Sequence, residues 1–261
     1  MGSGEGIRIA IANQKGGVGK TTTAINLGAS LAVGGKRVLI IDIDPQANAT
    51  SGLGVEQVPI SYKLLLGELP VEEAIKNTEI DNLFLIPSGI DLVGFEVESA
   101  SLDEKHFILL KRIEEIKGFD FIFIDCPPSL GLLTVNALVA AQKVLIPLQC
   151  EYYALEGLSK LINTIEIVRE GMNPDLKILG ILLTMFDGRT NLSKQVENEV
   201  RKFFPNEVFN TVVPRTVRLS EAPSFGKPIF LYDASSSGTT AYTKLAEEFI
   251  RRIENERKGT W

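Results

Sequence analysis

Short runs of apolar, often β-branched residues recur along the chain and are separated by stretches whose apolar positions follow a helical period. Most of these runs are continuously apolar instead of alternating, which is typical of strands covered on both faces. They lie at residues 7–12, 37–43, 83–87, 121–125, 143–147, 178–184 and 208–213. The pattern therefore predicts seven buried strands.

The stretches between these runs predict helices at residues 20–33, 105–117, 155–169, 192–204 and 240–257. The first is expected to end at Gly34-Gly35 and the third at Gly171, since glycine commonly terminates helices. Alternating strands and helices imply right-handed crossovers and a doubly wound, mainly parallel α/β sheet flanked by helices on both faces.

The domain organisation is expected to be simple. No linker rich in proline, serine or charge interrupts the pattern, and no internal repeat is visible. We expect one domain over residues 7–257, with short tails at 1–6 and 258–261.

Composition narrows the class of protein. Of the 261 residues, 44% are hydrophobic and 23% charged, as in ordinary globular proteins with a sizeable core. Cys126 and Cys150 each lie in an apolar run, which favours buried thiols over a disulfide framework or a metal site. The single histidine, His106, excludes histidine-cluster metal sites and Ser-His-Asp catalysis. No apolar run reaches the ~18 residues that span a bilayer, so we expect a cytoplasmic protein.

A glycine-rich segment follows the first predicted strand and precedes the first predicted helix. Such a loop binds phosphates, because its backbone N–H groups approach closely and the helix N-terminus adds positive potential. The segment departs from the usual GxxxxGK[ST] pattern: Gln14 replaces the first glycine, and Lys15 precedes the glycine pair. We predict that ATP and Mg²⁺ bind here, with Lys20 at the β- and γ-phosphates and the Thr21 hydroxyl on Mg²⁺. The expected phosphate-binding residues are Gly16, Gly17, Val18, Gly19, Lys20, Thr21 and Thr22.

Carboxylates stand at the ends of two predicted strands. Asp125 ends the run 121–125, while Asp42 and Asp44 lie at the end of the run 37–43. Ligands of parallel α/β sheets bind at this edge of the sheet. Asp42 and Asp44 are two residues apart and so point to one side of an extended chain. One of them can serve Mg²⁺ and the other can position the attacking water, while Asp125 is suited to support the metal.

These segments resemble motifs of a known family. Residues 15–22, 42–46 and 124–128 resemble the deviant Walker A, A′ and B motifs of the ParA/MinD superfamily. Three later segments, at 151–157, 184–190 and 214–228, resemble the chromosomal ParA (Soj) branch in particular. The resemblance extends from about residue 7 to residue 252.

The resemblance implies a homodimer that forms with ATP and encloses both nucleotides at its interface. In that arrangement Lys15 would reach the partner's phosphates and Asp44 would orient the hydrolytic water. Thr21 and Asp125 would serve the metal, with Asp42 as a second carboxylate on the metal side. The loops after Asp44 and Asp125 would act as switches that sense the γ-phosphate. Met185 and Pro214 are the expected neighbours of the adenine.

The resemblance also implies that the ATP dimer binds double-stranded DNA without sequence preference. Arg189 and Arg218 would contact DNA, with Lys227 added by its position. The formal net charge of −6 argues against a dedicated nucleic-acid binder, but a local cluster that includes Arg215 would suffice for phosphate contacts. A ParB-type partner would release the nucleoid-associated protein by stimulating hydrolysis. The implied process is chromosome segregation, with replication control left open.

Other functions of the superfamily fit less well. A MinD-like membrane-cycling ATPase needs a C-terminal helix with a free apolar face. Ala246, Phe249, Ile250 and Ile253 form an apolar stripe, but we expect it to pack on the domain, leaving only Trp261 in a short tail. An iron–sulfur reductase needs exposed cysteines, and a ligase related to dethiobiotin synthetase needs a substrate pocket that the sequence does not indicate.

Overall fold

The computed structural model describes residues 6–258. Its strands are β1 (Ile7–Ile11), β2 (Val38–Asp42), β3 (Lys76–Asn77), β4 (Leu83–Ile86), β5 (Phe121–Asp125), β6 (Lys143–Gln149) and β7 (Lys177–Thr184). Its helices are α1 (Lys20–Val33), α2 (Asn48–Gly52), α3 (Ile60–Leu66), α4 (Val71–Ala74), α5 (Leu92–Glu98), α6 (Ile108–Ile113), α7 (Leu132–Ala140), α8 (Ala154–Gly171), α9 (Asn191–Phe203), α10 (Val217–Glu221), α11 (Ile229–Tyr232) and α12 (Ser237–Lys258), with 3₁₀ turns η1 (Lys105–Phe107) and η2 (Ala222–Phe225). Of the predicted tails, Gly6 is buried and Lys258 ends α12, and the rest lies outside the described residues.

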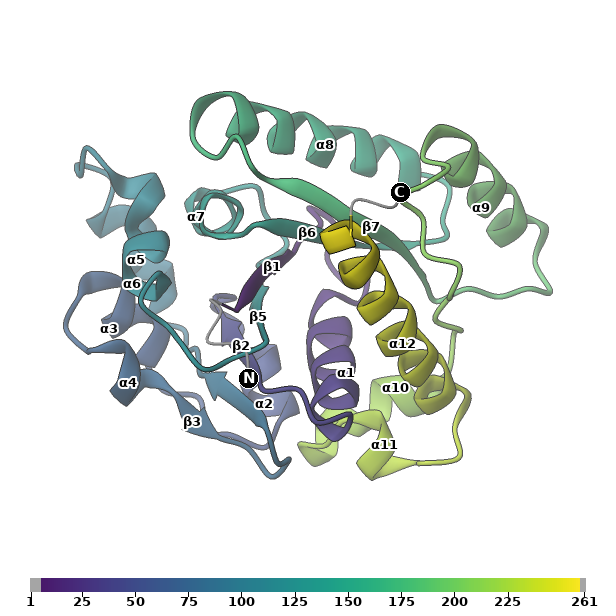
Figure 1. Ribbon diagram of the computed structural model, residues 1–261, viewed down its shortest axis with the longest axis horizontal. Coiled ribbons are helices and arrows are strands. Elements are labelled where there is room, and N and C mark those ends of the chain that lie inside the picture. The colour runs from purple at the N-terminus through teal and green to yellow at the C-terminus, as the bar shows by residue number, and fades with distance from the viewer. Residues whose placement is uncertain (1–5, 259–261) are drawn as a thin grey trace.

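The described strands form one seven-stranded sheet in the order β3-β4-β2-β5-β1-β6-β7. Every pairing is parallel except that of β3 with β4, which is antiparallel. The first strand of the chain lies near the middle of the sheet, and the chain winds outward from it in both directions (Figure 1). The predicted doubly wound, mainly parallel sheet is therefore confirmed.

Helices cover both faces of the sheet, with α1 and α12 on one side and α7 and α8 on the other (Figure 1). Side chains alternate between the two resulting cores. In β5, Ile122 and Ile124 belong to the core under α7 and α8, whereas Phe121 and Phe123 belong to the core under α1 and α12. Because both faces are buried, each strand is continuously apolar, as the sequence predicts.

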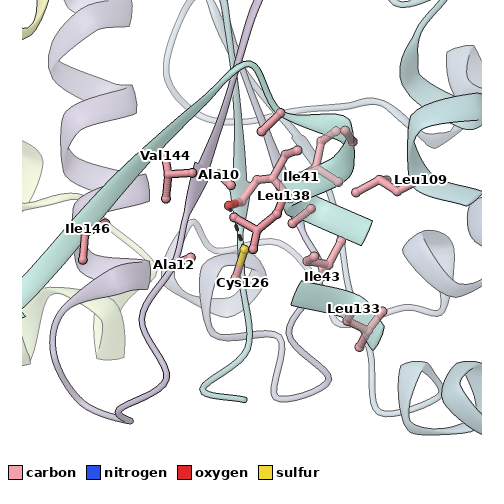
Figure 2. Packing of buried hydrophobic residues seen from close by; sticks show 14 of the residues in the cluster. Ala10, Ala12, Ile41, Ile43, Leu109, Cys126, Leu133, Leu138, Val144 and Ile146 are labelled. Atoms are coloured by element: carbon pink, nitrogen blue, oxygen red, sulfur yellow. Dashed lines mark hydrogen bonds between the residues drawn. The ribbon is translucent and has the colours of Figure 1, made fainter. Parts of the chain in front are cut away.

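Both cysteines are buried free thiols, as expected. Figure 2 shows Cys126 among aliphatic side chains of the first core, which include Ala10 and Ile41. Its thiol lies 3.6 Å from the carbonyl oxygen of Ile124. Cys126 therefore packs as a small apolar residue directly after the strand that carries Asp125.

The apolar stripe of α12 packs inward, as expected. Ala246, Phe249 and Ile253 are buried in the core beneath α1 and α12, and Ile250 packs against the same core. Trp261 lies outside the described residues. Among residues 6–258 there is no helix with the length and apolarity needed to cross a bilayer.

The strand predicted at residues 208–213 is wrong. This segment runs beside β7 and donates to it from the N–H groups of Phe209 and Val213, each at 2.9 Å, but its strand pairing is limited to an isolated bridge between Val208 and Ile181. The backbone N–H groups of Asn210 and Thr211 donate instead to the carboxylate of Glu248 on α12, each at 2.8 Å. A side chain therefore takes two N–H groups in the middle of the segment, which interrupts the ladder with β7.

Candidate functional site

The loop between β1 and α1 is fixed at several points. Its glycines Gly17 and Gly19 have φ values of +73° and +90°, which residues with a Cβ rarely adopt. The Asn13 amide donates to the carbonyl of Pro147 at 2.8 Å and accepts from the N–H of Lys15 at 3.0 Å. The Thr184 hydroxyl donates to the carbonyl of Val18 at 2.8 Å. The ends of β6 and β7 thus hold the loop in shape.

The loop leads directly into the N-terminus of α1, which carries positive potential. Helix α1 begins at Lys20 without a side-chain cap and with no acidic residue in its first turn. Its first N–H groups and its dipole are therefore left for an anion. The Lys20 ammonium lies 3.2 Å from the carbonyl of Lys15, and burial lowers the pKa of Lys20 despite the nearby carboxylates of Asp125 and Asp44. A bound phosphate would stabilise this cation, because burial disfavours the charged ammonium and a nearby negative charge favours it.

Two carboxylates meet beside the start of α1. Asp42 and Asp125 are register partners on the adjacent parallel strands β2 and β5, and both are fully buried. Burial raises the pKa of Asp125 well above its usual value, and the charge of Asp42 adds to this effect. The Thr21 hydroxyl and the Lys20 ammonium favour its charged form. Neither Asp125 oxygen, however, has a hydrogen-bond partner of good geometry among residues 6–258.

These unpartnered acceptors fit a magnesium site. Mg²⁺ keeps several waters and often binds through one or two side chains together with phosphates. Waters of such an ion could donate to Asp125 while the Thr21 hydroxyl binds the ion directly. The described residues contain no cluster of three or more His, Cys, Asp or Glu side chains arranged to hold a metal alone. The site would therefore need the nucleotide to complete it.

Asp42 has a different environment from Asp125. Its Oδ1 accepts from the N–H of Asp44 at 3.1 Å, and its Oδ2 accepts from the N–H and hydroxyl of Thr50 at 2.9 and 2.7 Å. Burial raises the pKa of Asp42 to about 6, although the Thr50 bonds lower it. Both oxygens are thus occupied by protein donors. This geometry favours a role in shaping the loop after β2 over the predicted role on the metal side.

One large cavity lies over the phosphate loop. Its volume is about 830 Å³, enough for a nucleotide, and its wall includes Lys20, Thr21 and Asp44. The predicted adenine neighbours Met185 and Pro214 also line it. Met185 has a φ of +49°, an uncommon conformation of the kind that clusters at binding sites.

Part of the cavity wall escaped sequence analysis. The segment 213–227 contributes much of it, including Arg215 and Lys227. The sequence indicated Pro214 of this segment as an adenine neighbour, and the rest of the segment only as a branch signature and a basic cluster. Lys227 was therefore expected at DNA and is found beside the nucleotide cavity. Pro128, in the motif after Asp125, also lines the cavity and lies near Gly16.

Lys15 forms an ion pair with Glu151 in the same chain, and both side chains are about two-fifths exposed. The next two residues, Tyr152 and Tyr153, are 79% and 67% exposed and stack edge to face. The segment 151–157 that resembles the family thus places a carboxylate on Lys15 and two aromatic rings at the surface beside the phosphate loop.

Two of the predicted DNA contacts, Arg189 and Arg218, lie on the loop after β7 and on the short helix α10. The Arg215 N–H donates to the carbonyl of Phe186 at 3.1 Å, which joins the loop after β7 to the segment before α10. Arg189 is 90% exposed and pairs with Asp187, whose pKa it lowers to about 2. Arg218 is half-exposed and pairs with Glu221 at 3.1 Å and with Asp233 at 3.4 Å. Such exposed ion pairs are weak, so a DNA phosphate could replace the carboxylates.

A parallel sheet with a strand–glycine loop–helix cradle and strand-end aspartates beside it defines a P-loop nucleoside triphosphatase. A family model described as an AAA domain matches residues 7–178. The chain is 56% identical over 248 residues to the chromosome partitioning protein ParA of Myxococcus xanthus, covering 94% of this chain and 88% of the relative. It is 56% identical over 244 residues to the sporulation initiation inhibitor protein Soj of Bacillus subtilis, covering 92% and 96%. The chain therefore belongs to the ParA/Soj family of chromosome-partitioning ATPases, within the ParA/MinD superfamily.

Solved structures agree with this assignment. The cobyrinic acid a,c-diamide synthase of Mycobacterium smegmatis, crystallised with ADP and magnesium, superposes with a TM-score of 0.84 at 37% identity, covering 97% of this chain and 98% of that one. The cell division ATPase MinD of Pyrococcus furiosus gives 0.78 at 31% identity, covering 95% and 99%. The chain is therefore an ATPase of this family, as the sequence motifs indicated.

Proposed function

We propose that this protein is a ParA-type partition ATPase that binds DNA without sequence preference as an ATP-dependent dimer. A ParB-type partner stimulates hydrolysis and so releases the protein from the nucleoid. The process is chromosome segregation, and one ATPase domain over residues 7–257 carries it out in the cytoplasm. The identity of 56% to ParA and Soj proteins over nearly the whole chain supports this proposal.

The phosphate loop binds ATP in this proposal. Lys20 and the first N–H groups of α1 hold the β- and γ-phosphates, and Thr21 and Asp125 hold hydrated Mg²⁺. The bound ion neutralises charge on the phosphates. Asp44 lines the same cavity and orients the water that attacks the γ-phosphate.

Lys15 connects hydrolysis to dimerisation. In the monomer its ammonium forms an ion pair with the Glu151 carboxylate at the surface. In the ATP dimer we propose that it leaves Glu151 and reaches the partner's phosphates, where its charge stabilises the transition state. The exposed Tyr152 and Tyr153 flank this position and would lie at the dimer interface.

One observation carries the proposed link between ATP and DNA. The segment 213–227 forms part of the nucleotide cavity through Arg215 and Lys227, and the same segment presents Arg218 to solvent. A nucleotide that orders this wall therefore orders the cationic surface. Dimerisation then places two such surfaces on one molecule, which raises the effective concentration of the second contact.

Arg189→Ala and Arg218→Ala should each weaken binding to non-specific DNA about equally for all sequences, because phosphate contacts carry no sequence information. In a two-fold dimer each change removes two cations. The slope of log K against log salt should therefore fall by roughly 2. Fluorescence anisotropy with ATP at several salt concentrations measures both effects, and nucleotide binding should stay unchanged.

Arg169→Ala provides the matched control. Arg169 is a half-exposed arginine that pairs with Glu166 at i,i+3 spacing, as Arg218 pairs with Glu221, but it lies on α8. This variant should bind DNA like the parent. An equal loss in all three variants would show that general surface charge, and not Arg189 and Arg218 in particular, determines DNA binding.

A further inference from the structure

A buried polar network lies behind Asp44 and joins three separate segments. Thr50 of α2 and Ser88, which follows β4, are both completely buried. The Ser88 N–H donates to the Thr50 hydroxyl at 2.9 Å, and that hydroxyl donates to Asp42 at 2.7 Å. The Ser88 hydroxyl donates to the carbonyl oxygen of Asp44 at 2.8 Å. Buried polar groups arranged in this way fix one geometry, because each lost partner is costly in the interior.

The network holds the backbone of Asp44 on both sides. Its N–H donates to Asp42, and its carbonyl accepts from Ser88 and, at 2.8 Å, from the N–H of Ala47. Ala47 has a φ of +51°, which costs about 1 kcal/mol or more for a residue with a Cβ. The turn after Asp44 is therefore strained and needs outside contacts to keep its shape. Ser88 supplies one from the segment after β4.

We propose that Ser88 and Thr50 are positioning residues for the hydrolytic step. They act through Asp44, and the inference therefore rests on the role of Asp44 proposed above. Ser88 fixes the Asp44 carbonyl, and Thr50 fixes both Ser88 and the Asp42 carboxylate that holds the Asp44 N–H. Without them the Asp44 carboxylate samples more orientations, and fewer of its encounters place the water in line with the γ-phosphate. Their removal should therefore lower kcat and leave ATP binding unchanged, since neither residue lines the nucleotide cavity.

The test compares kcat, the KM for Mg-ATP and ATP-dependent dimer formation in full-length variants. Ser88→Ala should lower kcat about tenfold, while KM and the dimer remain as in the parent. Ser99→Ala is the matched control, because Ser99 is also completely buried and also donates its hydroxyl to a carbonyl, that of Phe95. It should keep parental kcat, even if both variants melt at a lower temperature.

Thr50→Val and Thr50→Ser keep the inference testable if Ser88→Ala does not fold. Valine keeps the shape of threonine and removes its hydroxyl, whereas serine keeps the hydroxyl. We expect a loss of kcat in the first and its recovery in the second. Parental kcat in Ser88→Ala or Thr50→Val, or an equal loss in Ser99→Ala, would overturn the inference. Asp44→Ala, measured in parallel, tests the premise: if it turned over at the parental rate, the role of Asp44 itself would be wrong and this inference would fail with it.

Discussion

Replacing Lys20 with alanine should weaken ATP binding about a hundredfold. A hydrogen bond to a charged group contributes roughly 1.5–3 kcal/mol, and Lys20 is buried, where solvent screens the contact only weakly. The first N–H groups of α1 remain, so weak binding persists. Titration with a fluorescent ATP analogue in the presence of Mg²⁺ measures the change.

Lys143→Ala is the control for this variant. Lys143 is also a buried lysine, but it pairs with Glu256 away from the nucleotide cavity. Its removal should cost stability and leave ATP affinity unchanged. If Lys20→Ala bound ATP as tightly as the parent, the assignment of residues 13–22 as the phosphate loop would be refuted.

Replacing Asp44 with alanine should lower ATP hydrolysis about a hundredfold or more and leave ATP binding intact. A group that positions or activates the nucleophile typically contributes 10²–10⁴-fold, roughly, to the rate. Since the phosphates and Lys15 still form their contacts, the dimer should persist. Size exclusion in ATP, combined with a phosphate-release assay, should show a long-lived dimer that hydrolyses little.

Lys15→Ala distinguishes the two proposed roles. It should lose the ATP dimer as well as hydrolysis, because the lysine contacts the partner's phosphates in the proposed dimer. A Lys15→Ala protein that dimerised and turned over like the parent would remove that assignment. Rapid hydrolysis by Asp44→Ala would show that another group orients the water.

Most of the sheet could be predicted because its strands are buried on both faces. A short, continuously apolar run such as 121–125 is typical of a buried strand, and its predicted boundaries match β5. The segment 208–213 is also mainly apolar and β-branched but belongs to no strand, since Glu248 on a distant helix binds two of its N–H groups. Such a contact joins residues about forty positions apart and has no signature in the local pattern.

The short helices were missed for a related reason. Helix α7 is almost entirely apolar and is buried on nearly all sides, so it lacks the polar face that marks an amphipathic helix. Helices α2, α3 and α4 span only one or two turns each and depend on tertiary packing. Strand β3 comprises only the two residues Lys76 and Asn77 and is too short to predict.

The candidate site was predictable where a local motif carries the chemistry. The phosphate loop, Asp44 and Asp125 belong to such motifs, and the structure brings them together at the edge of the sheet. The wall formed by segment 213–227 and the bonds from Ser88 to Asp44 depend on how distant loops meet. Sequence alone could not distinguish the free carboxylate of Asp125 from the fully bonded one of Asp42.

The most direct test of the central claim measures binding to non-specific double-stranded DNA with ATP, with ADP and without nucleotide, at fixed salt. We predict tight, dimer-dependent binding with ATP only, and weak binding in the other two states because a monomer presents half of the cationic surface. Equal affinity in all three states would contradict the proposed coupling. If the ATP form did not bind DNA but bound anionic liposomes, a MinD-like membrane-cycling function would replace the proposed partition function.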